Sequence, residues 1–316
     1  MLAAAGFAGS AHATTAPSTP TKGVVIVTTN LAYQNASAAG TGIVLTKSGE
    51  VLTNNHVIRG ATTITAIVPA TGKRYSASVI GYDIADDVAL LKLNGASALA
   101  VATRGNSAKL KIGAITTAVG NANGGGRLVI TKGRVTGLNR TITVNDDQGG
   151  QTQLSGLIET SARLVPGDSG GPLLDSLGRV IGMDAAGSAT FAFETSDGYA
   201  IPINKAVTLV KQMEAGKAST LVHIGKTAFL GMSVQDVNGG TGVSVQSVVS
   251  GLPAANAGIA KGDVITAVDS TPVNRLDDLR AALFAHHPGD SVTLSFTDVL
   301  GNQTSAQITL ADGPPQ

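Results

Sequence analysis

A serine enclosed by glycines is the segment of the sequence with the clearest chemical meaning. Ser169 lies within Gly167-Asp168-Ser169-Gly170-Gly171-Pro172. Glycine adopts backbone dihedrals that other residues avoid, so such a segment can turn successive N–H groups toward one point. These groups suit a developing oxyanion, and the serine Oγ suits attack on a carbonyl carbon. Ser169 is therefore the candidate nucleophile, and the backbone N–H groups of Gly167, Asp168 and Ser169 are the candidate oxyanion donors.

A nucleophilic serine needs a base and an acid that orients the base. His56, in the segment Thr53-Asn54-Asn55-His56-Val57, is the candidate base. The candidate acids are Asp83, Asp86 and Asp87, just before an apolar run that can bury a carboxylate in part. A solvated loop position is the alternative for each, and Asp87 is favoured. The order His56, Asp87, Ser169 is one of those in which Ser-His-Asp triads occur.

The glycine-enclosed serine also fits the nucleophile elbow of α/β-hydrolases. That fold needs a strand before the serine, a helix after it, and the acid and base downstream. Here Gly170-Gly171-Pro172 blocks a helix, and the surroundings are rich in strands. The elbow is therefore the weaker reading. The other histidines have no comparable context and are expected at the surface: His12, His223, His286 and His287.

Composition limits the classes of protein to which the chain can belong. Its 316 residues suggest two domains, and 22 Lys and Arg against 21 Asp and Glu argue against nucleic-acid binding. The absence of Cys excludes disulfides, a Cys nucleophile and zinc-thiolate or iron–sulfur sites. With 40 Gly and 43% apolar residues, the sequence favours many short strands and tight turns.

Apolar runs separated by turns predict a barrel or sandwich over most of residues 24–201. Examples are the runs Val24–Val27, Val88–Leu93 and Val180–Met183. A helix should follow, with Asn204 as its N-cap and Gly216 as its stop.

A second unit, with strands and one helix from Leu276 to Phe284, follows a linker at Lys217–Lys226. Asn274 is the candidate cap of that helix. The predicted organisation is a leader, a linker, a first domain, a linker, a second domain and a disordered tail: Met1–Ala13, Thr14–Gly23, Val24–Gly216, Lys217–Lys226, Thr227–Asp312 and Gly313–Gln316.

The N-terminus has the features of a truncated signal peptide. Ala11-His12-Ala13 fits the small-x-small pattern before a signal-peptidase cut, but no Lys or Arg precedes the apolar stretch. A disordered tail is the alternative. The sequence therefore predicts export to an extracellular, cell-wall or periplasm-like space, with a membrane anchor if the chain starts further upstream.

The motifs together resemble HtrA/Deg-type serine proteases, closest to the secreted actinobacterial type. The matching stretches are GTGIVLTKSGEVLTNNHVI at 40–58, YDIADDVALLKL at 82–93, IETSARLVPGDSGGPLLDSLGRVIGM at 158–183 and GYAIPINKAV at 198–207. The resemblance implies a mainly β fold with a chymotrypsin-like double β-barrel. It also selects Asp87 as the acid and implies unfolded proteins or peptides as substrates. No metal or organic cofactor is implied. Members of the family often form homo-trimers through aromatic residues of an N-terminal segment, but Thr14–Gly23 contains none, so a trimer is one alternative and the sequence leaves the oligomeric state open.

Two residues near the nucleophile depart from that family's pattern. Asp168 stands where most HtrA proteins have Asn, and we expect its charge to be solvated or paired with Arg163 or Arg134. Arg163 lies six residues before Ser169 and is expected to point outward, leaving an apolar specificity pocket. Leu164, Met183 and Gly187 are the candidates for that pocket.

The second unit resembles a PDZ domain, a small α+β fold. Phe229-Leu230-Gly231-Met232 fits the loop that binds a peptide carboxylate, with a small packing domain as the alternative. The resemblance therefore implies a serine endopeptidase with a PDZ domain that binds peptide C-termini. A non-enzymatic chaperone or PDZ peptide-binding scaffold is the alternative, and intact candidate triad residues argue against it.

Overall fold

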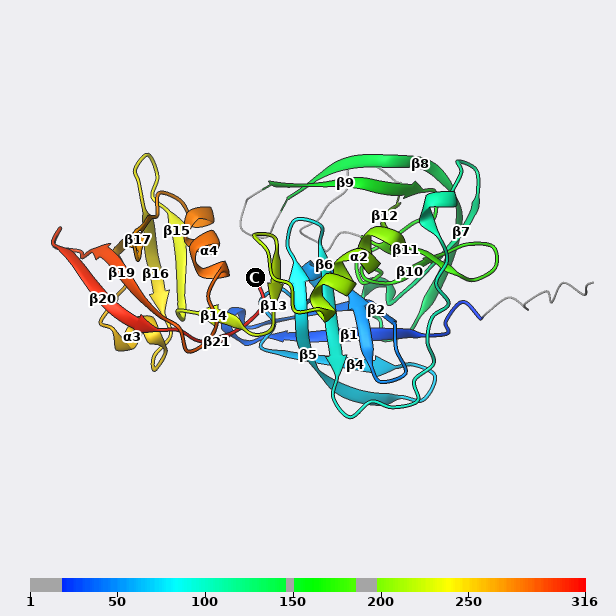
Figure 1. The fold of residues 1–316 in the computed structure, drawn as a ribbon, viewed down its shortest axis with the longest axis horizontal. Helices are drawn as coiled ribbons and strands as arrows, with labels where there is room; N and C mark the ends of the chain where they lie inside the picture. Colours follow the sequence, from blue (N-terminus) through cyan, green and yellow to red (C-terminus); the bar gives the residue numbers. More distant parts are fainter. Residues whose placement is uncertain (1–18, 146–150, 186–197) are drawn as a thin grey trace, which may run out of the picture.

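The computed structural model describes residues 19–145, 151–185 and 198–316. The chain forms a larger unit with two β-barrels and a smaller unit with a sheet and helix α4, joined by short strands (Figure 1). The fold is mainly β, as the sequence predicts.

The first barrel consists of six antiparallel strands. They are β1 (Val24–Leu31), β2 (Ala36–Val44), β3 (Glu50–Thr53), β4 (Thr63–Val68), β5 (Lys73–Asp83) and β6 (Val88–Leu93). The order is β5-β4-β1-β2-β3-β6, and pairing of β5 with β6 closes the barrel. Val25, Val27 and Leu91 are fully buried in its core. The short helix α1 (Asn55–Ile58) follows β3, so a rigid barrel edge carries His56.

The second barrel is closed in the order β10-β11-β12-β9-β8-β7. Its strands are β7 (Ile115–Gly120), β8 (Val129–Asn145), β9 (Gln151–Thr160), β10 (Pro172–Leu174), β11 (Val180–Asp184) and β12 (Gly198–Pro202). Three 3₁₀ turns, η1 (Ala32–Gln34), η2 (Ser107–Lys109) and η3 (Ala122–Gly124), lie in the connections of the two barrels. The segment between β9 and β10 carries Ser169, so two different barrels supply the candidate nucleophile and base.

Helix α2 (Ile203–Glu214) packs its apolar stripe on the barrels. Ile203, Ala206, Val210 and Met213 are its buried residues, at helical spacing. The N-cap is Pro202 rather than Asn204, whose side chain donates to Asn106 Oδ1 at 2.8 Å. The prediction of that cap was wrong because the helix begins at Ile203, which places Asn204 inside its first turn.

The smaller unit packs two helices on a sheet of order β15-β16-β17-β19-β20. Its elements are β14 (Thr227–Phe229), β15 (Met232–Asp236), β16 (Val243–Val248), α3 (Pro253–Asn256), β17 (Val264–Val268), β18 (Thr271–Pro272), α4 (Leu276–Phe284), β19 (Ser291–Thr297), β20 (Gln303–Thr309) and β21 (Ala311–Gly313). Helix α4 has the predicted bounds, but Arg275 is its N-cap, not Asn274. The Asp278 carboxylate accepts from both of their N–H groups and so sets this start.

The segment predicted as a linker contains a strand, β13 (Val222–Ile224), which pairs with β5. Within it, His223 is only 2% exposed, so the expected surface position was wrong. Its Nδ1 is 3.1 Å from the Phe284 carbonyl at the end of α4, and its Nε2 is 3.0 Å from the Lys226 carbonyl. The imidazole therefore joins β13 to the smaller unit.

The tail Gly313–Gln316 is ordered, contrary to the sequence prediction. Strand β21 pairs with β14, and the chain then returns to the larger unit, where the C-terminus lies between the two units (Figure 1). The Pro315 carbonyl accepts from Gly60 N at 2.8 Å, and the Gln316 carbonyl accepts from Asn55 Nδ2 at 2.9 Å. Backbone pairing and burial of Pro315 offset the entropy of ordering this segment.

Candidate active site

Both carboxylate oxygens of Asp87 hold His56. His56 Nδ1 is 2.8 Å from Asp87 Oδ2, and the His56 backbone N–H donates to Asp87 Oδ1 at 2.9 Å. Asp87 follows β5 with φ +53°, and Asn54 Nδ2 donates to its carbonyl at 2.9 Å. Because the carboxylate accepts at Nδ1, the neutral ring carries its proton there and presents Nε2 as the base.

The two neighbouring carboxylates lie elsewhere. Asp86 forms an ion pair with Lys205 at 2.6 Å, partly exposed to solvent. Asp83 Oδ1 accepts from Asp86 N at 2.8 Å, and burial raises the pKa of the Asp83 carboxyl. Of the three candidate acids, the structure brings Asp87 to His56.

Ser169 lies where the loop of the second barrel meets the first barrel. The Ser169 carbonyl accepts from Thr41 N on β2 at 2.8 Å. A Cβ atom at Gly40 would lie 2.7 Å from Val57 Cγ2 and 3.1 Å from the Ser169 carbonyl oxygen. Gly40 therefore allows the residue after His56 and the backbone of Ser169 to approach the same point of β2.

The backbone around Gly167 fits an oxyanion donor. Gly167 has φ +95°, and a Cβ there would lie 2.3 Å from the Asn121 carbonyl oxygen, so only glycine fits. The preceding Pro166 carbonyl accepts from Asn123 N at 2.6 Å. Since C=O and N–H point to opposite sides of a trans peptide, the Gly167 N–H points away from Asn123.

The Asp168 N–H donates to the Val165 carbonyl at 3.0 Å in a turn. It is therefore occupied, and our expectation that it serves as an oxyanion donor was wrong. The N–H groups of Gly167 and Ser169 remain the candidates.

Comparison with known proteins matches both units. A trypsin-like peptidase domain matches residues 40–183, and a PDZ domain matches residues 228–304. The serine protease PepD of Mycobacterium tuberculosis is 34% identical over 304 residues, which are 91% of this chain and 63% of PepD. The serine protease Do-like HtrA of Lactococcus lactis subsp. cremoris is 35% identical over 279 residues, which are 82% of this chain and 68% of that protein. The chain belongs to the HtrA family of trypsin-like serine endopeptidases.

A further relative and a solved structure are also similar to this chain. The periplasmic pH-dependent serine endoprotease DegQ of Escherichia coli is 34% identical over 271 residues, which are 81% of this chain and 55% of DegQ. A solved HtrA-type protease, AlgW with a decapeptide, has the same fold, with a TM-score of 0.53 and 23% identity over 94% of this chain and 97% of AlgW. The chain spans 55 to 68% of the length of these three curated relatives.

Residues 19–145, 151–185 and 198–316 of the HtrA chain contain no cluster of three metal-ligating His, Asp or Glu side chains. No helix in these ranges is long and apolar enough to span a bilayer.

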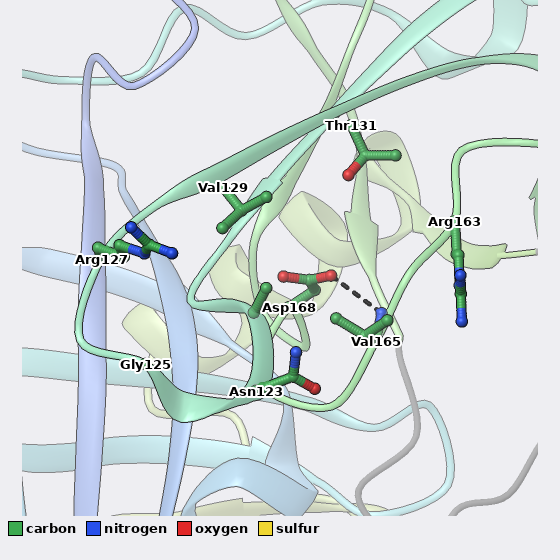
Figure 2. Close-up of a pocket in the computed structure, with 9 residues that line it drawn as sticks. Asn123, Gly125, Arg127, Val129, Thr131, Arg163, Val165 and Asp168 are labelled. Carbon is green, nitrogen blue, oxygen red and sulfur yellow. Dashed lines mark hydrogen bonds between the residues drawn. The ribbon is translucent and has the colours of Figure 1, made fainter.

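Asp168, directly before Ser169, closes the inner end of a cavity of about 660 Å³. Its lining residues are Ala122, Asn123, Gly125, Arg127, Val129, Thr131, Arg163, Val165 and Asp168. Figure 2 shows the carboxylate facing the cavity between Val129 and Val165, with the exposed Arg163 side chain pointing away from it. Asp168 Oδ2 accepts from Val165 N at 2.9 Å, and Oδ1 has no partner among the parts of the chain that the structure describes.

A second buried carboxylate, Asp184, belongs to the same region. Backbone hydrogen bonds join its strand to the nucleophile segment, from Gly170 N to the Asp184 carbonyl and from Asp184 N to the Gly171 carbonyl. Burial raises the pKa of Asp168 to about 6. Burial, and secondarily the charge of Asp168, raise the pKa of Asp184 well above its usual range.

The expected partners of Asp168 were therefore wrong. Asp168 is 5% exposed, which excludes full solvation, and Arg134 donates to the Gly113 carbonyl at 2.9 Å. The cation expected from the sequence does not reach it because both candidate arginines point elsewhere.

Asp168→Asn should stabilise the HtrA chain at pH 7.5 and change its stability little at pH 4. As pH rises from about 4 to 6, the unfolded carboxyl ionises while the folded one stays protonated, so the free energy of unfolding falls. A shift of this size corresponds to at most about 3 kcal/mol. Urea unfolding of both proteins at the two pH values measures the difference. Equal destabilisation at both pH values, with loss of activity, would indicate a specific ion pair instead.

Two of the three candidate pocket residues, Leu164 and Met183, lie among the described residues, and each packs against hydrophobic side chains. Met183 is fully buried in one hydrophobic cluster, and Leu164 packs against another. A Cβ at Gly198 would lie 2.6 Å from Leu164 Cγ, so Leu164 is held against β12. Gly187 lies outside the described residues.

Two backbone hydrogen bonds fix the candidate carboxylate-binding loop of the PDZ domain, Phe229–Met232. The Leu230 carbonyl accepts from Ala254 N and the Gly231 carbonyl from Val249 N, both at 2.8 Å. Gly231 has φ +78°, and a Cβ there would lie 2.4 Å from Leu252 Cβ. Met232 begins β15, whereas the Phe229 ring lies 5.2 Å from that of Tyr33 in the first barrel. Phe229 therefore contributes to the contact between the two units.

Sequence reasoning missed Thr41 and Asn123, which hold the nucleophile segment. The available signal was the pair of glycines around Thr41, since flanking glycines often mark a close backbone approach. The groups that approach Thr41 are the carbonyls of Gly167 and Ser169, more than 120 residues later in the chain. No pattern in the residues near Thr41 predicts them.

Proposed function

We propose that this HtrA chain hydrolyses peptide bonds in unfolded or exported proteins through an acyl-enzyme on Ser169, and that its PDZ domain binds peptide C-termini. The observation that carries the mechanism is the two-point attachment of His56 to Asp87, at 2.8 and 2.9 Å, from the barrel that also binds the Ser169 carbonyl. Cleavage of casein by the intact chain and by Ser169→Ala tests it.

The proposed reaction follows from these positions. His56 Nε2 takes the Ser169 Oγ proton as Oγ attacks the substrate carbonyl carbon. The N–H groups of Gly167 and Ser169 donate to the resulting oxyanion. Asp87 keeps the proton on Nδ1 and stabilises the imidazolium. His56 then protonates the leaving amine, and a water molecule, deprotonated by His56, hydrolyses the ester.

We expect cleavage after Val, Ala, Leu or Ile rather than after Lys, Arg or Asp. Leu164, Met183 and Gly187 are the proposed pocket residues, and the exposed Arg163 side chain leaves such a pocket apolar. Mass spectrometry of the products of an unfolded substrate identifies the cleaved bonds, and Arg163→Ala should leave the pattern unchanged. Dominant cleavage after acidic residues, lost in that variant, would place Arg163 in the pocket.

We expect the PDZ domain to bind free C-termini ending in Val, Leu, Ile or Ala. The Gly231 backbone conformation lets N–H groups converge on a carboxylate, and β15 and α4 form the walls of the proposed groove. Calorimetry on the intact Ser169→Ala protein should give about micromolar affinity for a free-acid peptide and much weaker binding of its amide. Equal binding of the two forms would exclude carboxylate capture.

Export of the chain is proposed on two grounds: the Ala11-His12-Ala13 pattern, and the periplasmic location stated for DegQ. A homo-trimer stays a prediction.

A further inference from the structure

Thr41 lies at the contact between the two barrels and is completely buried. It belongs to β2 of the first barrel, yet its hydroxyl binds two segments of the second. Thr41 Oγ1 donates to the Gly167 carbonyl at 2.8 Å and accepts from Asn121 N at 2.9 Å. One side chain thus satisfies two buried backbone groups more than 40 residues apart.

The backbone of Thr41 adds two further contacts to the same region. Its N–H donates to the Ser169 carbonyl at 2.8 Å, and its carbonyl accepts from Thr53 Oγ1 at 2.7 Å. Thr53 ends β3, two residues before the first residue of α1, which carries His56. Thr41 is therefore bonded both to the segment that carries the nucleophile and to the strand that leads to the base.

Two successive peptide groups of the nucleophile loop, defined as Val165–Gly170, are fixed in this way. Asn123 N holds the Pro166 carbonyl at 2.6 Å, and Thr41 Oγ1 holds the Gly167 carbonyl at 2.8 Å. The Asp168 N–H, on the opposite side of the second peptide, donates to the Val165 carbonyl at 3.0 Å. Rotation of the Gly167–Asp168 peptide would break both of its hydrogen bonds.

We propose that Thr41 is a positioning residue for the reaction, because its hydroxyl fixes the Gly167–Asp168 peptide, which lies between the two peptides that present the Gly167 and Ser169 N–H groups. This inference rests on the proposed Ser169 mechanism. Thr41 touches no reacting atom; it acts through the backbone of the nucleophile loop. Removal of the hydroxyl leaves the Gly167 carbonyl and the Asn121 N–H buried without their partner. Rotation of the Gly167–Asp168 peptide toward another donor would also turn the neighbouring peptides away from the oxyanion geometry.

The test compares Thr41→Val, Thr41→Ser and a matched control, Thr116→Val. Valine keeps the shape of threonine without the hydroxyl, and serine keeps the hydroxyl without the methyl group. Thr116 is also fully buried, and its hydroxyl bonds that of Thr160 at 2.8 Å, a residue outside the nucleophile loop. The control therefore measures the effect of losing a buried threonine hydrogen bond that does not involve the nucleophile loop.

The measured quantities are kcat, KM and the pH dependence of kcat for a fluorogenic peptide cleaved after Val, with melting temperatures alongside. Thr41→Val should lower kcat about 10- to 100-fold, less than the 10²–10³-fold typical for loss of an oxyanion donor, with little change in KM. The pH range in which kcat of Thr41→Val falls on the acid side should match that of the unaltered chain, because the His56–Asp87 pair is intact. Thr41→Ser should restore most of kcat, and Thr116→Val should lower only the melting temperature.

A Thr41→Val protein with wild-type kcat would overturn the inference, as would equal losses of kcat in Thr41→Val and Thr116→Val. If Thr41→Val does not fold, Thr41→Ser against Thr41→Ala decides: similar kcat in these two variants would also overturn it. Failure of the proposed mechanism is distinguishable, because the unaltered chain would then cleave the peptide no faster than Ser169→Ala.

Discussion

Ser169→Ala and His56→Ala should each abolish casein cleavage while leaving the protein folded. The nucleophile and the base act as a unit, so loss of either costs ~10⁴-fold or more in rate. The Ser169 change removes only Oγ, and the hydrogen bond from Thr41 N reaches the Ser169 backbone carbonyl, which stays. Release of acid-soluble fragments measures the activity, and circular dichroism and melting temperature measure the fold.

Ser161→Ala is the matched control for the nucleophile. Ser161 lies in the same connection and its Oγ accepts from Arg134 N at 3.0 Å, but it is exposed. Its loss should leave turnover close to that of the unaltered chain. Wild-type turnover in Ser169→Ala would show that another residue attacks the substrate.

Asp87→Asn should lower activity nearly as much as Ser169→Ala or His56→Ala, with kcat reduced about 10⁴-fold. The amide can donate to His56 Nδ1, which moves the ring proton to Nε2 and removes the base that faces the serine. Asp86→Asn and Asp83→Asn are the controls. Asp86 loses only a partly exposed ion pair to Lys205, and an asparagine at 83 can still accept from Asp86 N.

Kinetic constants of the three asparagine variants at one pH give the comparison. Losses of similar size for Asp86 and Asp87 would mean that the turn between β5 and β6, rather than one carboxylate, supports the histidine. A loss confined to Asp87 would identify it as the orienting acid.

The sequence alone predicts the features that depend on residues close together in the chain. The mainly β fold and helix α4 follow from runs of apolar residues and from helical spacing of Leu276, Leu279 and Leu283. The glycines around Ser169 indicate its backbone geometry, because Gly167 and Gly170 have positive φ. The carboxylate just before an apolar strand pointed to Asp87, and the structure places it on His56.

The sequence did not suffice where a residue's role depends on distant partners. Gly313-Pro314-Pro315-Gln316 has the composition of a disordered tail, yet the Pro315 carbonyl binds Gly60, about 250 residues earlier. His223 has no local motif, and its burial depends on the end of α4. The hydroxyl of Thr41 gains its role only when the two barrels meet, because its partners Gly167 and Asn121 belong to the second barrel.

Labelling with a fluorophosphonate probe tests the central claim most directly, because only an activated serine displaces the fluoride. The probe is added to the folded chain with and without a free-acid peptide ending in Val, and the labelled peptide is then located by mass spectrometry. We expect one probe per chain on Ser169, and none in His56→Ala or after unfolding in urea. A folded chain that binds casein but takes no label in either condition, or takes it on another serine, would contradict the account and favour a non-enzymatic scaffold.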